Sequence, residues 1–377
     1  MKILYWTELF WPHIGGVEVL SAQFLRALQK RNYECFVVTS HSSLNLPNET
    51  TLDGIPIYRF HFRKALANRD MKELAGIKQR LLELKQKLHP DLIHINFSGP
   101  SIYFHEMTRA QYPVPTLFTL HEPPTHASGH NTLLGRSLLS AQWVTAVSQA
   151  TLFQTLQLIP EIQPRASFIH NGLEMPVINP DPLIFQPPRL LCLGRLVRDK
   201  GFDLALDAFS IIIKKFPSSR LVIAGDGPAK VELEQQSANL GLTESVEFTG
   251  WVPPEKIPNL MNSSTVVMMP SRWSEPFGLV ALEAAQMARP IVAARVGGLP
   301  EIIVHERTGL LVDKENAFSI AEQIIYLLLH PEFAVELGQS ARRRAQEYFS
   351  IERLVNAYDS LYQKLNHSTI NRVEKRK

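Results

Sequence analysis

Short apolar runs alternate along the chain with longer segments whose apolar residues recur at helical spacing. This alternation is typical of a parallel β-sheet with crossover helices. The first apolar run, Lys2 to Trp6, is expected to form a strand, and the segment after it a helix. One face of that helix is apolar and consists of Val17, Leu20, Phe24 and Leu28. The pattern therefore predicts an α/β fold made of repeated strand and helix units.

A proline-rich segment interrupts this pattern near the middle of the chain. Residues 176–188 hold five prolines and show little periodicity, which indicates a linker. The strand and helix pattern then starts again at Arg189. A chain of 377 residues also exceeds the size of one typical core. We therefore predict two doubly wound, Rossmann-like domains, residues 1–172 and 189–350, joined by a linker at 173–188 and facing each other across a cleft.

The remaining elements follow from the same pattern. In the first domain we expect further strands at Tyr33 to Ser40, Ile55 to Phe62, Asp91 to Phe97, Pro115 to His121, Trp143 to Ser148 and Ala166 to His170. In the second we expect them at Arg189 to Leu193, Arg220 to Ala224, Val246 to Gly250, Thr265 to Pro270, Ile291 to Arg295 and Gly309 to Val312. Helices are expected at Phe202 to Phe216, Phe318 to Leu329, Glu332 to Tyr348 and Ile351 to Leu365, before a frayed basic tail.

The composition is that of a globular protein, with 45% hydrophobic and 20% charged residues. The net charge of +3 is too small to suggest general nucleic-acid binding. Cys35 and Cys192 lie in apolar runs and are expected to be buried, reduced thiols, with no disulfide or zinc spacing. No run of eighteen apolar residues and no signal-peptide pattern occurs, so we expect a cytoplasmic location.

The most informative stretch is Ser274 to Ala285, where a Pro-Phe-Gly turn leads from a strand into an apolar helix. The first amides of a helix lack intrahelical partners and lie at the positive end of its dipole, so those of Phe277, Gly278 and Leu279 could bind phosphate. Glu283, inside the helix, could accept hydrogen bonds from ribose hydroxyls. Glu275, in the loop, could reach a group beyond the phosphates. The alternative is a capped helix with two solvated acids.

A second loop carries positive charge. Arg195 and Lys200 flank the turn between the first strand and first helix of the second domain. A guanidinium and an ammonium at this spacing could converge on a diphosphate, although a cationic loop alone is more often a surface turn. Further along, Gly250-Trp251-Val252 ends a strand where a flat base could pack.

The first domain has two candidate contacts at strand ends, where doubly wound folds bind ligands. Gly15-Gly16 follows the first strand but does not match the G-x-G-x-x-G fingerprint of NAD sites, and it could simply form a turn. His121 ends another strand and is a candidate ligand contact. We do not expect His121, His126 and His130 to bind a metal, because their spacing is not H-E-x-x-H and two prolines prevent a regular helix.

Residues 59–89 form the most basic segment of the chain, with nine lysine or arginine residues and three acids. An apolar stripe at helical spacing runs through it, at Leu74, Ile77, Leu81, Leu84 and Leu88. Such a segment can dock on an anionic membrane or hold an anionic acceptor, but it is more often a solvated helix face over a core stripe.

Taken together, these motifs resemble a family 4 retaining glycosyltransferase of the GT-B fold, over nearly the whole chain. The resemblance rests on Gly15-Gly16, His170-Asn171-Gly172, Gly194-Arg195-Leu196 with Lys200-Gly201, Glu275-Pro276-Phe277-Gly278-Leu279 with Glu283-Ala284, and Gly297-Gly298-Leu299-Pro300-Glu301. One departure is Glu122, where many relatives carry Asp after the histidine.

The resemblance implies a nucleotide-sugar donor held mainly by the second domain, and an acceptor held by the first. Its catalytic set would be His121, Glu275, Arg195 and Lys200. Donor binding would involve Gly16, Arg195, Lys200, Val252, Glu275, Phe277, Gly278, Leu279 and Glu283. Acceptor binding would involve Gly15, Gly16 and His121. The helix at 351–377 would pack back on the first domain.

The resemblance also implies a metal-independent hexosyltransferase that retains the anomeric configuration, in a pathway such as polysaccharide biosynthesis. We expect no cofactor beyond a UDP- or GDP-linked donor, although no motif separates UDP, GDP and ADP. The acceptor could be a glycan, a lipid-linked glycan or a small molecule.

We expect a monomer or homodimer that does not bind nucleic acid. Residues 59–89 offer a peripheral contact with the inner membrane face. A nucleotide-sugar epimerase or hydrolase, and a silent sugar-nucleotide-binding subunit, are the alternatives.

Overall fold

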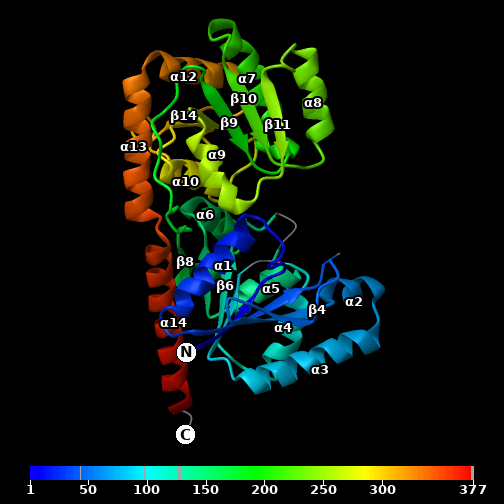
Figure 1. Cartoon of the computed structure of the whole chain (residues 1–377). Helices are drawn as coiled ribbons and strands as arrows, with labels where there is room; N and C mark the ends of the chain where they lie inside the picture. The colour runs from blue at the N-terminus through cyan, green and yellow to red at the C-terminus, as the bar shows by residue number, and fades with distance from the viewer. Residues whose placement is uncertain (43, 97–98, 126–128, 375–377) are drawn as a thin grey trace. The chain divides into compact units, whose positions relative to one another are not determined.

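The computed structural model describes residues 1–42, 44–96, 99–125 and 129–374 (Figure 1). The chain forms two compact units, Met1–Gly172 with Ile351–Lys377, and Leu173–Ser350. The proline-rich segment 173–188, expected as a linker, belongs to the second unit. There Asn262 Nδ2 donates to the carbonyl of Asn179 at 3.0 Å, and the Arg289 guanidinium donates to the carbonyl of Asp181.

The first unit contains one sheet, which has eight strands among the described residues, in the order β3-β4-β2-β1-β5-β6-β7-β8. All neighbouring strands are parallel except β3 and β4. The strands are β1 (Lys2–Trp6), β2 (Glu34–Ser40), β3 (Glu49–Leu52), β4 (Ile55–Phe60), β5 (Leu92–Ile95), β6 (Thr116–Leu120), β7 (Trp143–Ala146) and β8 (Ala166–Phe168). The helices are α1 (Gly16–Gln29), α2 (Phe62–Asn68), α3 (Met71–Leu88), α4 (Ile102–Arg109), α5 (Leu133–Ser140), α6 (Gln149–Leu158), η1 (Pro160–Arg165) and α14 (Ile351–Glu374).

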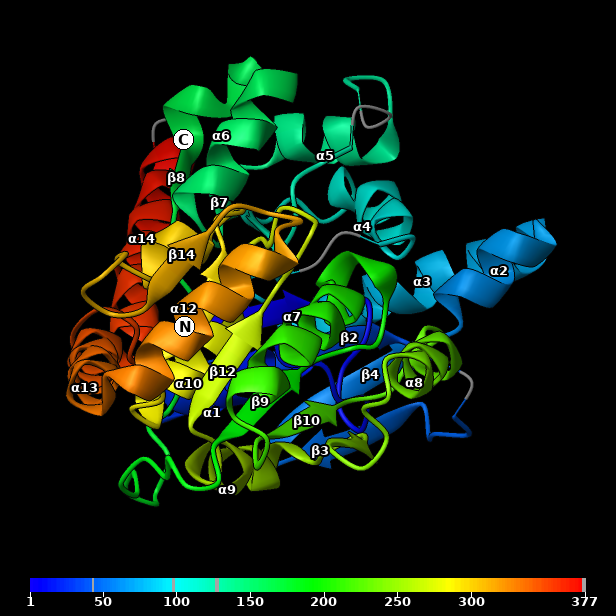
Figure 2. The same cartoon turned by 90° about the horizontal axis from the view of Figure 1, so that it is seen from above.

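The second unit contains a parallel sheet, with six strands among the described residues, in the order β11-β10-β9-β12-β13-β14. Its strands are β9 (Arg189–Leu193), β10 (Arg220–Ala224), β11 (Val246–Gly250), β12 (Val266–Met269), β13 (Ile291–Ala294) and β14 (Leu310–Val312). Its helices are η2 (Arg198–Lys200), α7 (Phe202–Lys215), α8 (Lys230–Asn239), η3 (Pro254–Lys256), α9 (Ile257–Asn262), α10 (Leu279–Gln286), α11 (Leu299–Ile302), α12 (Ala317–Leu329) and α13 (Pro331–Tyr348). Figure 2 shows α7 and α12, which pack against each other, on the same side of this sheet.

Each sheet has a point where the chain reverses the direction in which it adds strands. In the second unit β9 and β12 are neighbours, and in the first unit β1 and β5 are neighbours. The loops that leave two such strands turn to opposite faces of the sheet, which opens a crevice at their carboxyl ends. A ligand site in the second unit is therefore expected at the residues that follow β9 and β12.

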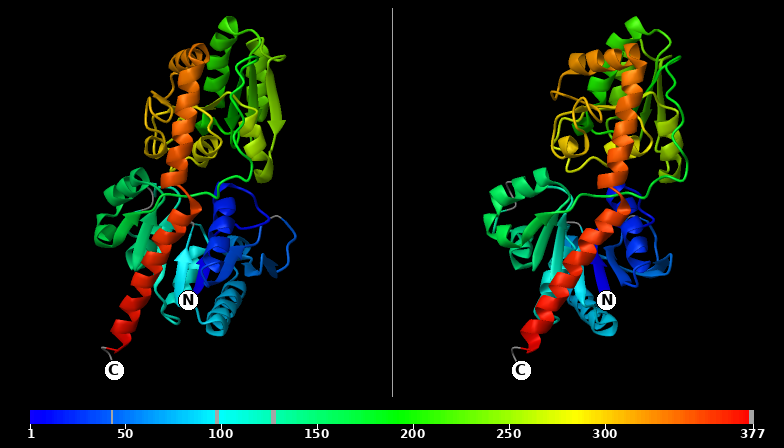
Figure 3. Two further views of the ribbon diagram at one scale, coloured as in Figure 1. Left: turned by 60° about the vertical axis from the view of Figure 1, so that its left-hand side comes forward. Right: turned by 90° about the vertical axis from the view of Figure 1, so that its left-hand side faces the viewer.

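The last helix, α14, completes the first unit and packs against α1 (Figure 3). Two of its side chains reach polar groups inside the sheet. The hydroxyl of Tyr362 lies 2.6 Å from His94 Nδ1, and that of Tyr358 lies 3.0 Å from Thr119 Oγ1. We expected a frayed tail after Leu365, but α14 continues to Glu374, and residues 375–377 lie outside the described part of the chain.

The basic segment 59–89 forms the end of β4, α2 and α3, and the apolar stripe in α3 is not available to a membrane. The five stripe residues are all buried in the core of the first unit. Lys85 also points into this core, with its Nζ 2.7 Å from Thr108 Oγ1, and burial lowers its pKa to about 7. The exposed face of α3 is thus less basic than the sequence suggests. Among the described residues, no helix is both long and apolar enough to span a bilayer.

Candidate functional site

The centre of the candidate site is an ion pair between the loops that follow β9 and β12. Lys200 Nζ lies 2.6 Å from Glu275 Oε1, and the same oxygen accepts a hydrogen bond from Ser271 Oγ at 2.6 Å. Glu275 is only 4% exposed. The sequence suggested an acid in the loop that could reach a group beyond the phosphates. The structure shows that Glu275 is buried and forms an ion pair with Lys200. The pair joins two motifs that lie 75 positions apart in the sequence.

Glycines allow these loops to approach each other. A Cβ atom on Gly201, whose φ is +69°, would lie 2.1 Å from the carbonyl oxygen of Pro270. A Cβ atom on Gly297, whose φ is +53°, would lie 2.1 Å from the carbonyl oxygen of Glu275. The neighbouring Gly298 donates its amide to that same oxygen at 2.7 Å. The Gly297-Gly298 motif therefore supports the loop that carries Glu275.

Sequence reasoning missed two residues between β12 and α10. Arg272 binds both carboxylate oxygens of Asp203 in α7, at 2.6 Å each, and so fixes this loop to the loop that carries Lys200. Trp273 lies beside them, with its ring centroid 5.8 Å from Lys200 Nζ. Its buried indole N–H has no hydrogen-bond partner among the described residues. The only signal in the sequence was an arginine and a tryptophan between a strand and a helix.

The segment after Glu275 opens α10 as the sequence predicts. Gly278 is its N-cap, with a φ of +108°, and the helix begins at Leu279. The Phe277 side chain is buried and packs against Phe349, with ring centroids 5.8 Å apart. Phe277 therefore anchors the turn by its side chain, and the following amides lie at the positive end of the helix dipole.

Glu283 lies further along α10 and is partly buried. This burial raises the pKa of its carboxyl group to about 7. A carboxylate in such a place gains from any hydroxyl that donates to it, because it has lost part of its hydration. The position is compatible with the expected contact to a ribose.

The raised pKa of Glu283 leads to a prediction about stability. Between pH 4.5 and 7 the folded protein binds this proton more tightly than the unfolded chain, so stability should fall as the pH rises. A fully buried group would lose about 3 kcal/mol over this range, and we expect about 2 because Glu283 keeps some exposure. Melting temperatures of Glu283→Gln should lack this decline between pH 5 and 8.

The control for this experiment is Glu232→Gln, which changes an exposed acid in α8. Its melting temperatures should follow those of the unchanged protein. An identical pH profile in all three proteins would contradict the assignment of the decline to Glu283.

The other two residues expected near the donor lie at strand ends of the same sheet. Arg195 follows β9 and has an exposed side chain, and Val252 follows β11 and is partly buried. The loop that carries Arg195 contacts the loop after β10, since Leu196 donates its amide to the carbonyl of Asp226 at 2.8 Å. That loop in turn reaches the end of β11, where Gly225 donates its amide to the carbonyl of Gly250 at 2.8 Å. Within the described residues, Arg195 makes no hydrogen bond or ion pair with Lys200 or Glu275, so its role stays a prediction.

In the first unit, the expected contacts lie at the ends of β1 and β6. Gly15 is the N-cap of α1 and Gly16 its first residue. His121 Nε2 lies 3.1 Å from Asn96 Oδ1, and Asn96 Nδ2 donates to Ser21 Oγ in α1 at 3.1 Å. Burial lowers the pKa of His121 to about 4, so its ring is neutral at pH 7.

Of the two histidines that follow His121 in the sequence motif, the structure describes only His130. His126 lies outside the described residues. His130 Nε2 lies 2.8 Å from the carboxylate of Glu161. The described part of the chain contains no group of three or more side chains placed to hold a metal ion.

Comparison with known proteins gives two family matches that together span most of the chain. Residues 14–175 match the model described as Glycosyltransferase Family 4, and residues 179–344 match Glycosyl transferases group 1. A relative from Bacillus anthracis, N-acetyl-alpha-D-glucosaminyl L-malate synthase, is 25% identical over 93% of this chain and 94% of its own. A GDP-mannose-dependent alpha-(1-6)-phosphatidylinositol monomannoside mannosyltransferase from Mycolicibacterium smegmatis is 34% identical over 42% of this chain and 43% of its own.

Solved structures share the fold. Sucrose-phosphate synthase from Thermosynechococcus elongatus superposes with a TM-score of 0.84 at 22% identity, covering 98% of this chain and all of that one. Anabaena HepE in complex with UDP-glucose gives a TM-score of 0.78 at 22% identity, covering 97% of this chain and 100% of that one.

Two Rossmann-like units with largely parallel sheets, and a ligand crevice expected at the switch point of each, define the GT-B fold. The two family matches identify the protein as a glycosyltransferase. The chain belongs to glycosyltransferase family 4, which confirms the resemblance found in the sequence.

Proposed function

We propose that this enzyme moves a sugar from a UDP- or GDP-linked donor to a hydroxyl acceptor, with retention of the anomeric configuration. The observation that carries the proposal is the Lys200–Glu275 pair at the β9–β12 switch point, next to the start of α10. An ammonium and helix-end amides at one place suit a diphosphate. The names of Anabaena HepE bound to UDP-glucose, and of the GDP-mannose-dependent relative, support a nucleotide-sugar donor.

In this proposal each donor group has a partner in the second unit. Arg195, Lys200 and the amides of Gly278 and Leu279 bind the diphosphate. Val252 lies beside the base, Glu283 accepts from the ribose hydroxyls, and Glu275 contacts the donor sugar. The Gly16 loop and His121, from the first unit, contact the diphosphate and the transferred sugar.

The reaction breaks the bond between the anomeric carbon and the phosphate oxygen and forms a bond from that carbon to the acceptor oxygen. The acceptor proton leaves with the phosphate. Glu275 is a weak nucleophile because Lys200 and Ser271 already hold one of its oxygens at 2.6 Å. This favours attack on the same face that the phosphate leaves. The two cations would balance the charge of the leaving diphosphate, so we also propose that no metal is needed.

A thermal-shift panel of UDP-, GDP- and ADP-sugars tests the proposal, with magnesium or with EDTA. A donor present at 100 times its Kd should stabilise the protein by about 2.7 kcal/mol, because it binds only the folded state. We expect one nucleotide series to raise the melting temperature, and EDTA to leave the shift unchanged. A shift that appears only with magnesium would contradict metal independence.

Incubation of the bound donor without an acceptor separates the remaining functions. A transferase should leave most of the donor intact until a hydroxyl acceptor is added, and the product should keep the anomeric configuration in its NMR coupling constants. Rapid conversion without an acceptor would indicate an epimerase or hydrolase. The absence of binding to every donor would favour a silent subunit.

A further inference from the structure

A group of cations and histidines lies at the carboxyl edge of the first sheet, beside the turn that contains Gly15. Arg59 is in β4. Arg63 lies in the first turn of α2, and His61 is the N-cap of that helix. His13 is in the loop after β1, and His41 follows β2. The rings of His41 and His61 stack, with centroids 4.0 Å apart. Strand-end loops of this kind are where doubly wound domains bind their ligands.

Arg59 is a buried cation without an acidic partner. The residue is only 4% exposed, and it donates to two backbone carbonyls, those of Trp11 at 2.7 Å and Pro47 at 3.3 Å. No ion pair among the described residues includes it. Carbonyl groups satisfy the donors of a guanidinium but do not neutralise its charge. A buried positive charge is costly unless an anion lies near it.

Arg63 is held in place by the one acid of the group. Its Nε lies 2.7 Å from Glu8 Oε1, which also accepts from Ser40 Oγ at 2.9 Å, while Oε2 accepts from the Ser101 amide at 3.1 Å. The Glu8 side chain is 1% exposed, whereas that of Arg63 is 54% exposed. Within the described residues, the two Nη groups of Arg63 make no hydrogen bond. Glu8 therefore orients a guanidinium whose outer donors face solvent.

His13 lies in the loop whose Trp11 carbonyl accepts a hydrogen bond from Arg59. Its Nε2 is 2.6 Å from Ser42 Oγ. Burial lowers the pKa of His13, and the charges of Arg59 and Arg63 lower it further. The other charged groups nearby are Lys64, Arg80 and Glu73, which act on His61, and Glu18, whose carboxylate lies close to Gly15. Among the described residues, Glu8 is the carboxylate that pairs with Arg63, and Arg59 has no acidic partner, so the charge of Arg59 is not compensated by an ion pair.

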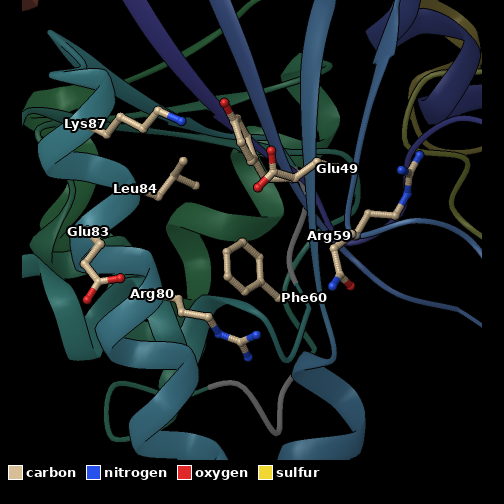
Figure 4. A pocket seen from close by; sticks show the side chains of 9 residues that line it. Glu49, Arg59, Phe60, Arg80, Glu83, Leu84 and Lys87 are labelled. Carbon is tan, nitrogen blue, oxygen red and sulfur yellow. The ribbon is translucent and has the colours of Figure 1, made fainter.

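The groove on the opposite side of β4 has a different charge balance. Figure 4 shows Phe60 and Arg80 in this groove, with Leu84 and Lys87 further along α3, and the guanidinium of Arg59 pointing away from it. Arg59, Arg80 and Lys87 line the groove together with Glu49 and Glu83. Because the Arg59 guanidinium points away, the two acids face the charges of Arg80 and Lys87 and balance them. The Arg59 guanidinium instead donates to the carbonyl of Trp11, in the loop that carries His13.

We propose that His13, Arg59 and Arg63 form a subsite for an anionic group of the acceptor, a carboxylate or a phosphate, with Glu8 as the positioning residue for Arg63. The proposal rests on the proposed function, because it assigns this part of the first unit to the acceptor. The acceptor then carries its reacting hydroxyl and an acidic group on the same molecule. Arg63 and His13 contact the anion directly. Arg59 is buried, and it attracts the anion by its charge without touching it.

Calorimetric titration of the whole protein with inorganic phosphate and with succinate tests the subsite. Arg63→Gln and His13→Gln should each weaken binding about tenfold or more, because each removes a charge-assisted or polar contact to the anion. Lys72→Gln, which changes an exposed cation of the same segment, is the matched control and should bind like the unchanged protein. Equal affinity in Arg63→Gln and in the control would overturn the proposal.

Two further binding measurements identify the molecule that carries the anion. Binding of free phosphate or succinate indicates an acidic group on a soluble or glycan acceptor. Binding only to vesicles that contain phosphatidylglycerol, lost in Arg63→Gln and absent with phosphatidylcholine, indicates a lipid phosphate. If neither the free anions nor the vesicles bind through Arg63, the subsite does not exist.

Donor binding separates this proposal from the proposed function. Arg63→Gln and His13→Gln should keep the thermal shift caused by the nucleotide sugar, since the donor groups that cause it lie mainly in the second unit. If no nucleotide sugar binds while the anions do, the proposed function fails and the anion subsite stands. If the donor binds and the anions do not, the subsite fails alone.

Discussion

Replacement of Lys200 by methionine is expected to lower kcat/KM by about 10²- to 10³-fold, the usual effect of removing one group that stabilises developing negative charge. Methionine is close to lysine in length and flexibility but has neither the charge nor the N–H donors. Lys214→Met, an exposed change at the end of α7, is the control and should keep full activity. An unchanged kcat/KM in Lys200→Met would show that the ammonium does not act on the diphosphate.

The same change should also lower stability, because it leaves Glu275 with an unbalanced buried charge. We expect a loss of about 2–3 kcal/mol, below the range for wholly buried pairs because the Lys200 side chain is 28% exposed. Adding Glu275→Gln should restore the melting temperature, since the buried charge is then gone, but it should not restore activity. Recovery of activity in the double variant would mean that the two residues matter only for folding.

Replacement of Gly297 by alanine should be among the most damaging small changes in the second unit. The new methyl group would overlap the carbonyl oxygen of Glu275, at 2.1 Å, in a backbone conformation that already disfavours a side chain. We expect a loss of about 3 kcal/mol or more, from overpacking and from the positive φ together. Donor affinity should fall as well, because the loop that carries Glu275 must move.

Gly241→Ala is the matched control for this change. Gly241 also has a positive φ, of +70°, but nothing lies within 4 Å of its added Cβ atom. Gly241→Ala should lower the free energy of unfolding by about 1 kcal/mol, the cost of a side chain at a positive φ, and it should bind the donor normally. Thermal unfolding and donor titration of both variants make the comparison. Equal losses would show that contact with Glu275 does not explain the need for Gly297.

The fold could be predicted from the sequence because its parallel strands are buried on both faces and appear as unbroken apolar runs. The bounds of β1, β9, β10 and β11 are those expected. The expected strand from Ile55 to Phe62 ends at Phe60, since α2 begins at Phe62. The strand β3 (Glu49–Leu52) was missed, because it lies at the edge of its sheet and none of its residues is fully buried.

The site could be predicted only in part. The motif order indicated which loops carry the functional groups, and the β9–β12 switch point brings two of those loops together. The sequence could not show that Lys200 and Glu275 form a pair, because that depends on which strands are neighbours in the sheet. It also gave no sign that Lys85 is buried. Helical periodicity places Lys85 next to the apolar stripe, and only packing decides whether such a side chain reaches solvent or the core.

The position of α14 has a consequence for how the protein is made. The second unit is continuous in sequence, from Leu173 to Ser350, whereas the first unit needs Tyr358 and Tyr362 to satisfy the polar groups of its interior. A ribosome releases the chain from its N-terminus, so the unit that is translated first must wait for the last helix to emerge. The later unit can fold before it, and the earlier unit is the one exposed to chaperones and proteases during synthesis.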